Sequence, residues 1–160
     1  AACCLFWTLG GQQVGKAALS GWREVVLPER RAGARLWPFD GSLAELGAGE
    51  APIIAETYPA EAYGHVGIRF SAGRSKRRQA DRRANADAIL SWAERAGVVL
   101  ESALERAIAD GFGAAANGED QFDAMAGLAG MIEVVDGRRA EAPVDTDRCV
   151  VEGWILGQLD

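Results

Sequence analysis

Three acidic side chains stand where carboxylates could bind a metal and act on a phosphodiester. Glu56 ends the apolar run 52–55, and Pro59 follows as a helix start. A strand, a carboxylate and then a helix is how an α/β sheet brings an acid to its ligand-binding edge. Asp120 and Asp123 are three residues apart at an expected helix start, so both project from one face. Mg²⁺ or Mn²⁺ prefers such oxygens and can activate a water for phosphodiester hydrolysis.

Each of these acids also has a structural interpretation. Desolvating an unpaired carboxylate is costly, so a buried Glu56 needs an Arg, a Lys or a metal beside it. From the strand alone, pairing with Arg or Lys is favoured. On spacing alone, Asp120 and Asp123 are better explained as the acidic first turn of a helix. Asp123, however, lies one turn in and next to Phe122, where an acid is less useful as a cap.

A glycine-rich stretch at 10–17 is a second candidate site. It has the phosphate-loop spacing G-x-x-x-x-G-K, follows an apolar run and opens an expected helix. Ala17 stands where the motif requires Ser or Thr, so the hydroxyl ligand for Mg²⁺ is missing and nucleotide hydrolysis is not expected. A close-packed helix start is the structural alternative. The functional alternative is that backbone N–H groups and Lys16 hold a phosphate.

Basic residues concentrate between positions 69 and 83, where seven cations accompany one acid, Asp81. The cations are Arg69, Arg74, Lys76, Arg77, Arg78, Arg82 and Arg83. A solvated helix start would explain the run, although cations at a helix N-terminus oppose its dipole. The functional interpretation is a nucleic-acid contact in which Lys16, Arg74, Lys76, Arg77 and Arg78 hold phosphates. Phe70, next to Arg69, is the only aromatic residue between positions 69 and 83 and none lies among the later cations, so base stacking is not indicated.

The whole chain limits these options. Its 160 residues, 49% of them hydrophobic, suffice for one domain with a real core. A formal charge of -6 argues against a generally basic nucleic-acid coat protein. No apolar run approaches the roughly 18 residues of a membrane span, so none is expected. Three cysteines without metal-ligand spacing favour free thiols in the cytoplasm.

Short apolar strands separated by helices predict an α/β layer fold. Strands are expected near 3–9, 35–37 and 52–55. Helices are expected at 13–27, where Pro28 ends or kinks the first, and at 75–96, 101–110 and 119–137. His65 is the only histidine, and no Ser or Cys stands beside it in the sequence to suggest a hydrolase triad.

The motifs occur in an order that resembles a bacterial and archaeal family of predicted RNase H-like nucleases, known as domain of unknown function 429. They are LGG at 9–11 with VG at 14–15, LWPFD at 36–40, AETYP at 55–59, ED at 119–120 with FDA at 122–124, and EGWI at 152–155. Each motif is short, and their order over nearly the whole chain carries the resemblance.

The resemblance implies a central sheet flanked by helices, with carboxylates from the first strand, a later strand and the last helix converging on metal. Glu56 would match the later strand, and Asp120 and Asp123 the last helix. A glycine-flanked first-strand Asp is not found. We therefore expect 1–160 to be a single RNase H-like domain that lacks its N-terminal strands.

From these patterns we expect a cytoplasmic, metal-dependent nuclease of α/β, RNase H-like type. Glu56, Asp120 and Asp123 would be its catalytic ligands for Mg²⁺ or Mn²⁺, and nucleic acid its partner, with a homodimer as an option. One alternative is a phosphate- or nucleotide-binding module built on the Gly10–Lys16 loop. The other is a non-catalytic interaction domain that retains the fold.

Overall fold

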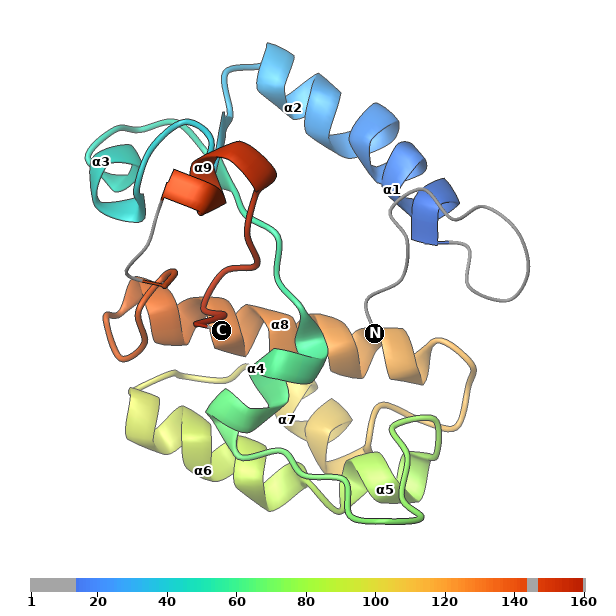
Figure 1. Ribbon diagram of the computed structural model, residues 1–160. Coiled ribbons are helices and arrows are strands. Elements are labelled where there is room, and N and C mark those ends of the chain that lie inside the picture. Colours follow the sequence, from blue (N-terminus) through green and yellow to red (C-terminus); the bar gives the residue numbers. More distant parts are fainter. Residues whose placement is uncertain (1–13, 144–146, 160) are drawn as a thin grey trace. The chain divides into compact units, whose positions relative to one another are not determined.

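The computed structural model describes residues 14–143 and 147–159, and these are mostly helical (Figure 1). They group into two compact units, which are taken separately below. The first unit contains the described residues up to Ala55 together with Val150–Gly153. The second contains the described residues of Glu56–Cys149 and Trp154–Asp160. None of the described helices has the length and apolar character needed to cross a membrane.

The first unit begins with one continuous helical course. It consists of α1 (Val14–Gly21), the π-helical segment η1 (Trp22–Val26) and α2 (Leu27–Arg31). Pro28 therefore does not end the helix. It occupies the first turn of α2, and the wider π-helical turn directly precedes it.

Two expected strands of this unit are confirmed and pair in parallel. β1 (Arg35–Leu36) lies beside β2 (Ile53–Ile54) in the register Arg35 to Ile53 and Leu36 to Ile54. Between them, α3 (Leu43–Gly47) starts with a capping box of Ser42 and Glu45, in which each side chain accepts from the other's main-chain N–H. The expected strand at 3–9 lies outside the described residues. This short sheet among helices is compatible with the expected mixed α/β class.

The second unit is helical around one hydrophobic core. Its helices are α4 (Pro59–Val66), α5 (Gln79–Arg83), α6 (Ala86–Ala96), α7 (Ser102–Asp110) and α8 (Gly118–Val135). The core is centred on Phe122 and Ile108, with Ile89 and Trp92 from α6. A further helix near the C-terminus, α9, spans Asp147–Glu152.

Helix α4 packs closely on α8 (Figure 1) because α8 carries glycines at the contact. A Cβ atom added to Gly130 would lie 2.8 Å from the Cβ of Ala62. Directly before α4, Glu56 forms a single parallel bridge to Ile155, and its main-chain oxygen accepts from Leu156 over 2.8 Å. These contacts fix the chain that leads to Tyr63.

The single helix expected at 75–96 is wrong, because the chain breaks at Ala84–Asn85 between α5 and α6. Asn85 is buried, and its side chain bonds two main-chain groups that precede it, one in the segment before α5 and one within α5. Its Oδ1 accepts from the N–H of Arg69 over 2.8 Å, and its Nδ2 donates to the carbonyl of Asp81 over 3.0 Å. Such side-chain bonds compete with helical ones and interrupt the helix.

Candidate nucleic-acid interface and the predicted acidic site

Asp123 lies early in α8, and both of its carboxylate oxygens are engaged by other side chains. The phenol of Tyr63, from α4, donates to Oδ1. The ammonium group of Lys76 lies 2.5 Å from Oδ2 and 3.3 Å from Oε1 of Glu119. The carboxylate is therefore the centre of a polar network that joins α4, α8 and the chain between α4 and α5.

The electrostatics of this network keep Tyr63 and Lys76 in their ordinary charge states. Burial, together with the hydrogen bond to Asp123, raises the pKa of the Tyr63 phenol far above its usual range. Burial lowers the pKa of the Lys76 ammonium, but the carboxylates of Asp123 and Glu119 outweigh it and the net shift is upward. At neutral pH the phenol is protonated and the ammonium is charged, so neither is a base or a nucleophile.

The three predicted metal ligands do not form a metal site. Across residues 14–143 and 147–159, no three His, Cys, Asp or Glu side chains gather in a group that could hold a metal ion. Glu56 and Asp120 are exposed, and Lys76 occupies the place beside Asp123 that a cation would need. The residues that the structure describes therefore do not fit the expected Mg²⁺ or Mn²⁺ site.

Glu56 also lacks the structural partner that sequence reasoning assigned to it. It makes no ion pair with any residue that the structure describes. The expectation of a partner assumed burial, whereas the side chain is exposed and water can solvate its charge. Asp120 is likewise exposed in the first turn of α8, as the capped-helix interpretation predicts.

The segment 69–78, called the basic loop below, has a main chain fixed at several points. Besides the bond from Arg69 to Asn85, the N–H of Ser75 donates to Oδ2 of Asp81 over 2.9 Å. The carbonyl of Lys76 accepts from Arg82 over 2.6 Å. The loop is thus held in one conformation by side chains of α5 and the turn that follows it.

Some cations of the predicted basic cluster bond groups within the chain, and others make no ion pair with a described residue. Arg82 is only 2% exposed and bonds three main-chain carbonyls, so it cannot reach a ligand. Arg78 pairs with Asp81, Arg83 with Asp110, and Lys76 with the acids of α8. Three exposed arginines make no ion pair within the described part of the chain, and these are Arg69, Arg74 and Arg77.

Of the predicted phosphate-binding residues, Arg74 and Arg77 therefore stay available for a ligand. Arg78 and Lys76 are engaged within the chain. The side chain of Lys16 and the start of the Gly10–Lys16 loop lie outside the described residues. That loop consequently stays a prediction.

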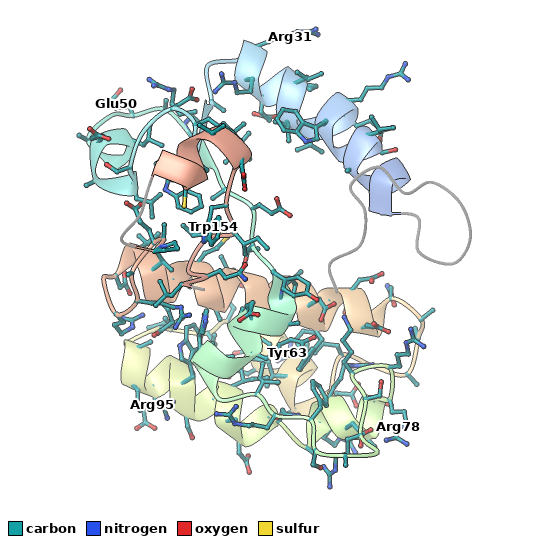
Figure 2. All side chains as sticks on the ribbon, viewed as in Figure 1. Arg31, Glu50, Tyr63, Arg78, Arg95 and Trp154 are labelled. Carbon is teal, nitrogen blue, oxygen red and sulfur yellow. The ribbon has the colours of Figure 1, made fainter. Side chains whose placement is uncertain are left out.

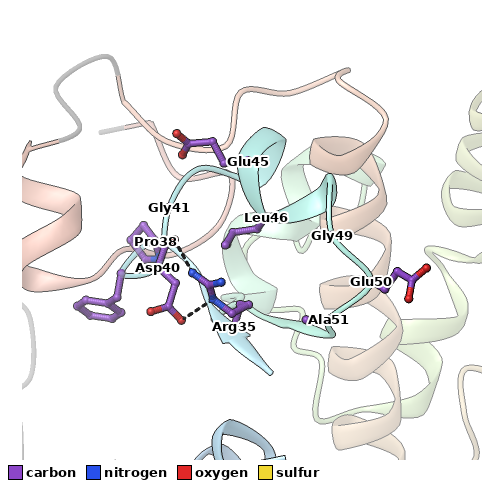
Figure 3. Close-up of a pocket in the computed structure, with 10 residues that line it drawn as sticks. Arg35, Pro38, Asp40, Gly41, Glu45, Leu46, Gly49, Glu50 and Ala51 are labelled. Atoms are coloured by element: carbon purple, nitrogen blue, oxygen red, sulfur yellow. Dashed lines mark hydrogen bonds and ion pairs between the residues drawn. The ribbon is translucent and has the colours of Figure 1, made fainter. Parts of the chain in front are cut away.

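An open cavity adjoins the basic loop, and a second one lies in the first unit. The first is formed by α4 and residues 68–71, and includes Tyr63, Phe70 and Arg69. The second lies around Arg35 and Asp40 (Figure 3). There the N–H of Leu36 and the side chain of Arg30 hold the pKa of the Asp40 carboxyl below its usual range. Arg30 and Arg35 pair with Asp40, and two further acids, Glu45 and Glu50, also line this cavity.

Sequence reasoning missed the burial of Arg82 and the contact between Tyr63 and Asp123. The sequence carries one signal for Arg82, because it lies at helical spacing from 85, 89 and 92. In the structure all four of these positions are buried. Asp123 and Tyr63 are 60 residues apart, and no local pattern links them.

Comparison with known proteins gives no relative. No protein-family model, curated protein sequence or solved structure matches this chain. Its function is therefore inferred from its own side chains, their contacts and the order of its sequence motifs.

Proposed function

We propose that this chain binds nucleic acid through the phosphate backbone and that the basic loop is the contact surface. The supporting observation is that Arg69, Arg74 and Arg77 are exposed on one short segment and make no ion pair with a described residue. In a chain with a formal charge of -6, three such cations within nine residues are unexpected for solubility alone.

The local geometry suits a phosphate ligand. Arginine presents a planar fork of N–H donors that matches two phosphate oxygens and stays charged at every working pH. Because the main chain at Arg69, Ser75 and Lys76 is already fixed, less conformational entropy is lost when the arginines close on a ligand. Contacts of this kind position a strand without reading its sequence.

The resemblance to RNase H-like nucleases supports nucleic acid as the ligand class. We propose on the same ground that the chain derives from such a domain, and its parallel strand pair is compatible with that origin. Hydrolysis is a separate question, because Glu56, Asp120 and Asp123 do not assemble a metal site. A non-catalytic binding role is therefore the function that the contacts favour.

A binding measurement tests the proposal. Fluorescence anisotropy with a labelled single strand and a labelled duplex would compare wild type with the triple variant Arg69→Ala, Arg74→Ala, Arg77→Ala. The matched control is Arg31→Ala, Arg95→Ala, Arg106→Ala, which removes the same charge from other exposed positions. We expect the loop variant to lose about tenfold or more in affinity and the control to lose far less. Equal losses in both variants would remove the basic loop from the proposal.

Cleavage is tested beside binding. Wild type and Asp123→Asn would be incubated with the same strands and Mn²⁺, and the products separated by size. We expect no cleavage by either protein. Mn²⁺-dependent cleavage that Asp123→Asn abolishes would restore the predicted nuclease function and overturn the non-catalytic interpretation.

A further inference from the structure

The cavity beside the basic loop has a small-residue wall on α4. Ala60 and Gly64 are four residues apart, so they share a helix face, and both are exposed. A Cβ atom added to Gly64 would meet no atom within 4 Å. Because these two residues are small, this wall leaves space that larger side chains would occupy. The buried Ile68 also lines the cavity.

Aromatic rings form another part of the lining. Tyr63 and Phe70 both line the cavity, and both rings are partly exposed. Their centroids are 5.6 Å apart in an edge-to-face arrangement, and each also contacts the fully buried Phe122. Figure 2 shows Tyr63 on α4, and the hydrogen bond from its phenol to Asp123 fixes that ring further. Rings that are held in place in this way are suitable surfaces for stacking.

Polar groups also line the cavity. Glu61 from α4 supplies an acceptor, and the basic loop supplies the hydroxyl of Ser71 and the cation of Arg69. Ser71 also belongs to the turn that leads to Arg74, since its carbonyl accepts from the N–H of Arg74 over 2.9 Å. The cavity and the unpaired arginines therefore lie on one continuous stretch of chain.

We propose that this cavity is a subsite for one nucleobase of a single-stranded nucleic acid whose phosphates lie on the basic loop. The base would stack on Tyr63 or Phe70, and its amino edge would donate to Glu61. A paired base is stacked within a duplex and cannot enter, so the subsite favours single strands. The inference deepens the proposed function and rests on it.

The test separates bases from backbone. Anisotropy would be measured with a labelled single strand of about twelve nucleotides and with an abasic strand of equal length. Wild type is expected to bind the strand with bases roughly tenfold more tightly, as one stacked base allows. Gly64→Leu places a side chain in the open wall, and its Cβ would meet no atom within 4 Å. This variant is expected to reduce the ratio to about one while keeping affinity for the abasic strand.

Two further variants make the outcome decisive. Gly47→Leu is the matched control, because Gly47 is also helical with nothing within 4 Å of an added Cβ, but does not line this cavity. Phe70→Leu removes a stacking face, and thermal melting would verify that it folds. Equal wild-type binding of both strands, or an unchanged ratio in Gly64→Leu, would overturn the subsite and leave the backbone proposal intact. Absence of binding to either strand would overturn both.

Discussion

The guanidinium of Arg82 donates from Nη1 to the main-chain carbonyl of Lys76 over 2.6 Å. Its Nε and Nη2 donate to the carbonyls of Gly111 and Gly113 over 2.8 Å and 2.6 Å. One buried cation therefore ties the basic loop to the turn that precedes α8. Each carbonyl gains a charged donor, which is stronger than a neutral one and would be costly to lose in a buried setting.

Replacing Arg82 with Lys should destabilise the second unit. An ammonium group cannot present the planar set of donors that reaches all three carbonyls, so at least one is left without its partner. We expect the free energy of unfolding to fall by about 2–4 kcal/mol. Arg83→Lys is the neighbouring control, because Arg83 forms an exposed ion pair with Asp110 and should change stability by less than about 0.5 kcal/mol. Urea unfolding followed by circular dichroism measures both, and equal midpoints would contradict the role of Arg82.

The close approach at Gly118 should be equally sensitive. A Cβ atom there would lie 2.5 Å from the carbonyl oxygen of Phe112 and 2.7 Å from Nη2 of Arg82. Gly118→Ala is therefore expected to cost about 1–3 kcal/mol of stability. Gly64→Ala, also in a helix but with open space around it, should instead stabilise by about 0.5–1 kcal/mol. A tolerated Gly118→Ala in the same urea assay would show that the turn is not packed as described.

The phenol of Tyr63 should report on Asp123. In a Tyr58→Phe background Tyr63 is the remaining tyrosine, so ultraviolet absorbance follows its ionisation alone. Burial and the Asp123 carboxylate both raise its pKa, and Asp123→Asn removes the second cause. We expect the phenol to ionise at a lower pH in Asp123→Asn than in the parent protein. Identical titration curves would mean that the hydrogen bond is not made.

His65 should make stability depend on pH in a defined window. Burial, aided by the nearby charge of Arg139, lowers its pKa below the ordinary value of 6.5. Below pH 6.5 the unfolded chain therefore binds a proton at His65 that the folded chain binds less readily, so the free energy of unfolding falls as the pH falls. Above pH 6.5 the stability does not depend on this group. Its buried Nδ1 has no hydrogen-bond partner in the described structure.

The measurement is the difference between two unfolding series. Wild type and His65→Gln would be unfolded by urea from pH 7.5 down to pH 5, above the range in which ordinary carboxyl groups titrate. We expect the stability of wild type to decline relative to His65→Gln through this range. Parallel curves would show that the imidazole is as free to protonate in the folded chain as in the unfolded one.

Local patterns predicted much of the fold but little of the site. The parallel strands near 35–37 and 52–55, and the helix ends at Gly97 and Gly111, follow from apolar runs and from glycine's access to positive φ. The sequence predicts that Glu56, Asp120 and Asp123 meet, because Glu56 follows an apolar strand and the two aspartates lie at a helix start. Which charge lies beside Asp123 depends instead on how distant segments pack, and the chain places Lys76 there. Asn85 similarly breaks a helix through a bond to Arg69 that periodicity does not reveal.

The salt dependence of nucleic-acid binding tests the central proposal most directly. The slope of log binding constant against log salt concentration counts the phosphates that the protein neutralises, at about 0.7 for each on a single strand. If Arg69, Arg74 and Arg77 contact phosphates, their triple alanine variant should show a slope shallower by about 2 than wild type, while the matched variant at Arg31, Arg95 and Arg106 keeps the wild-type slope. An unchanged slope in the loop variant, or the same change in both, would contradict the account.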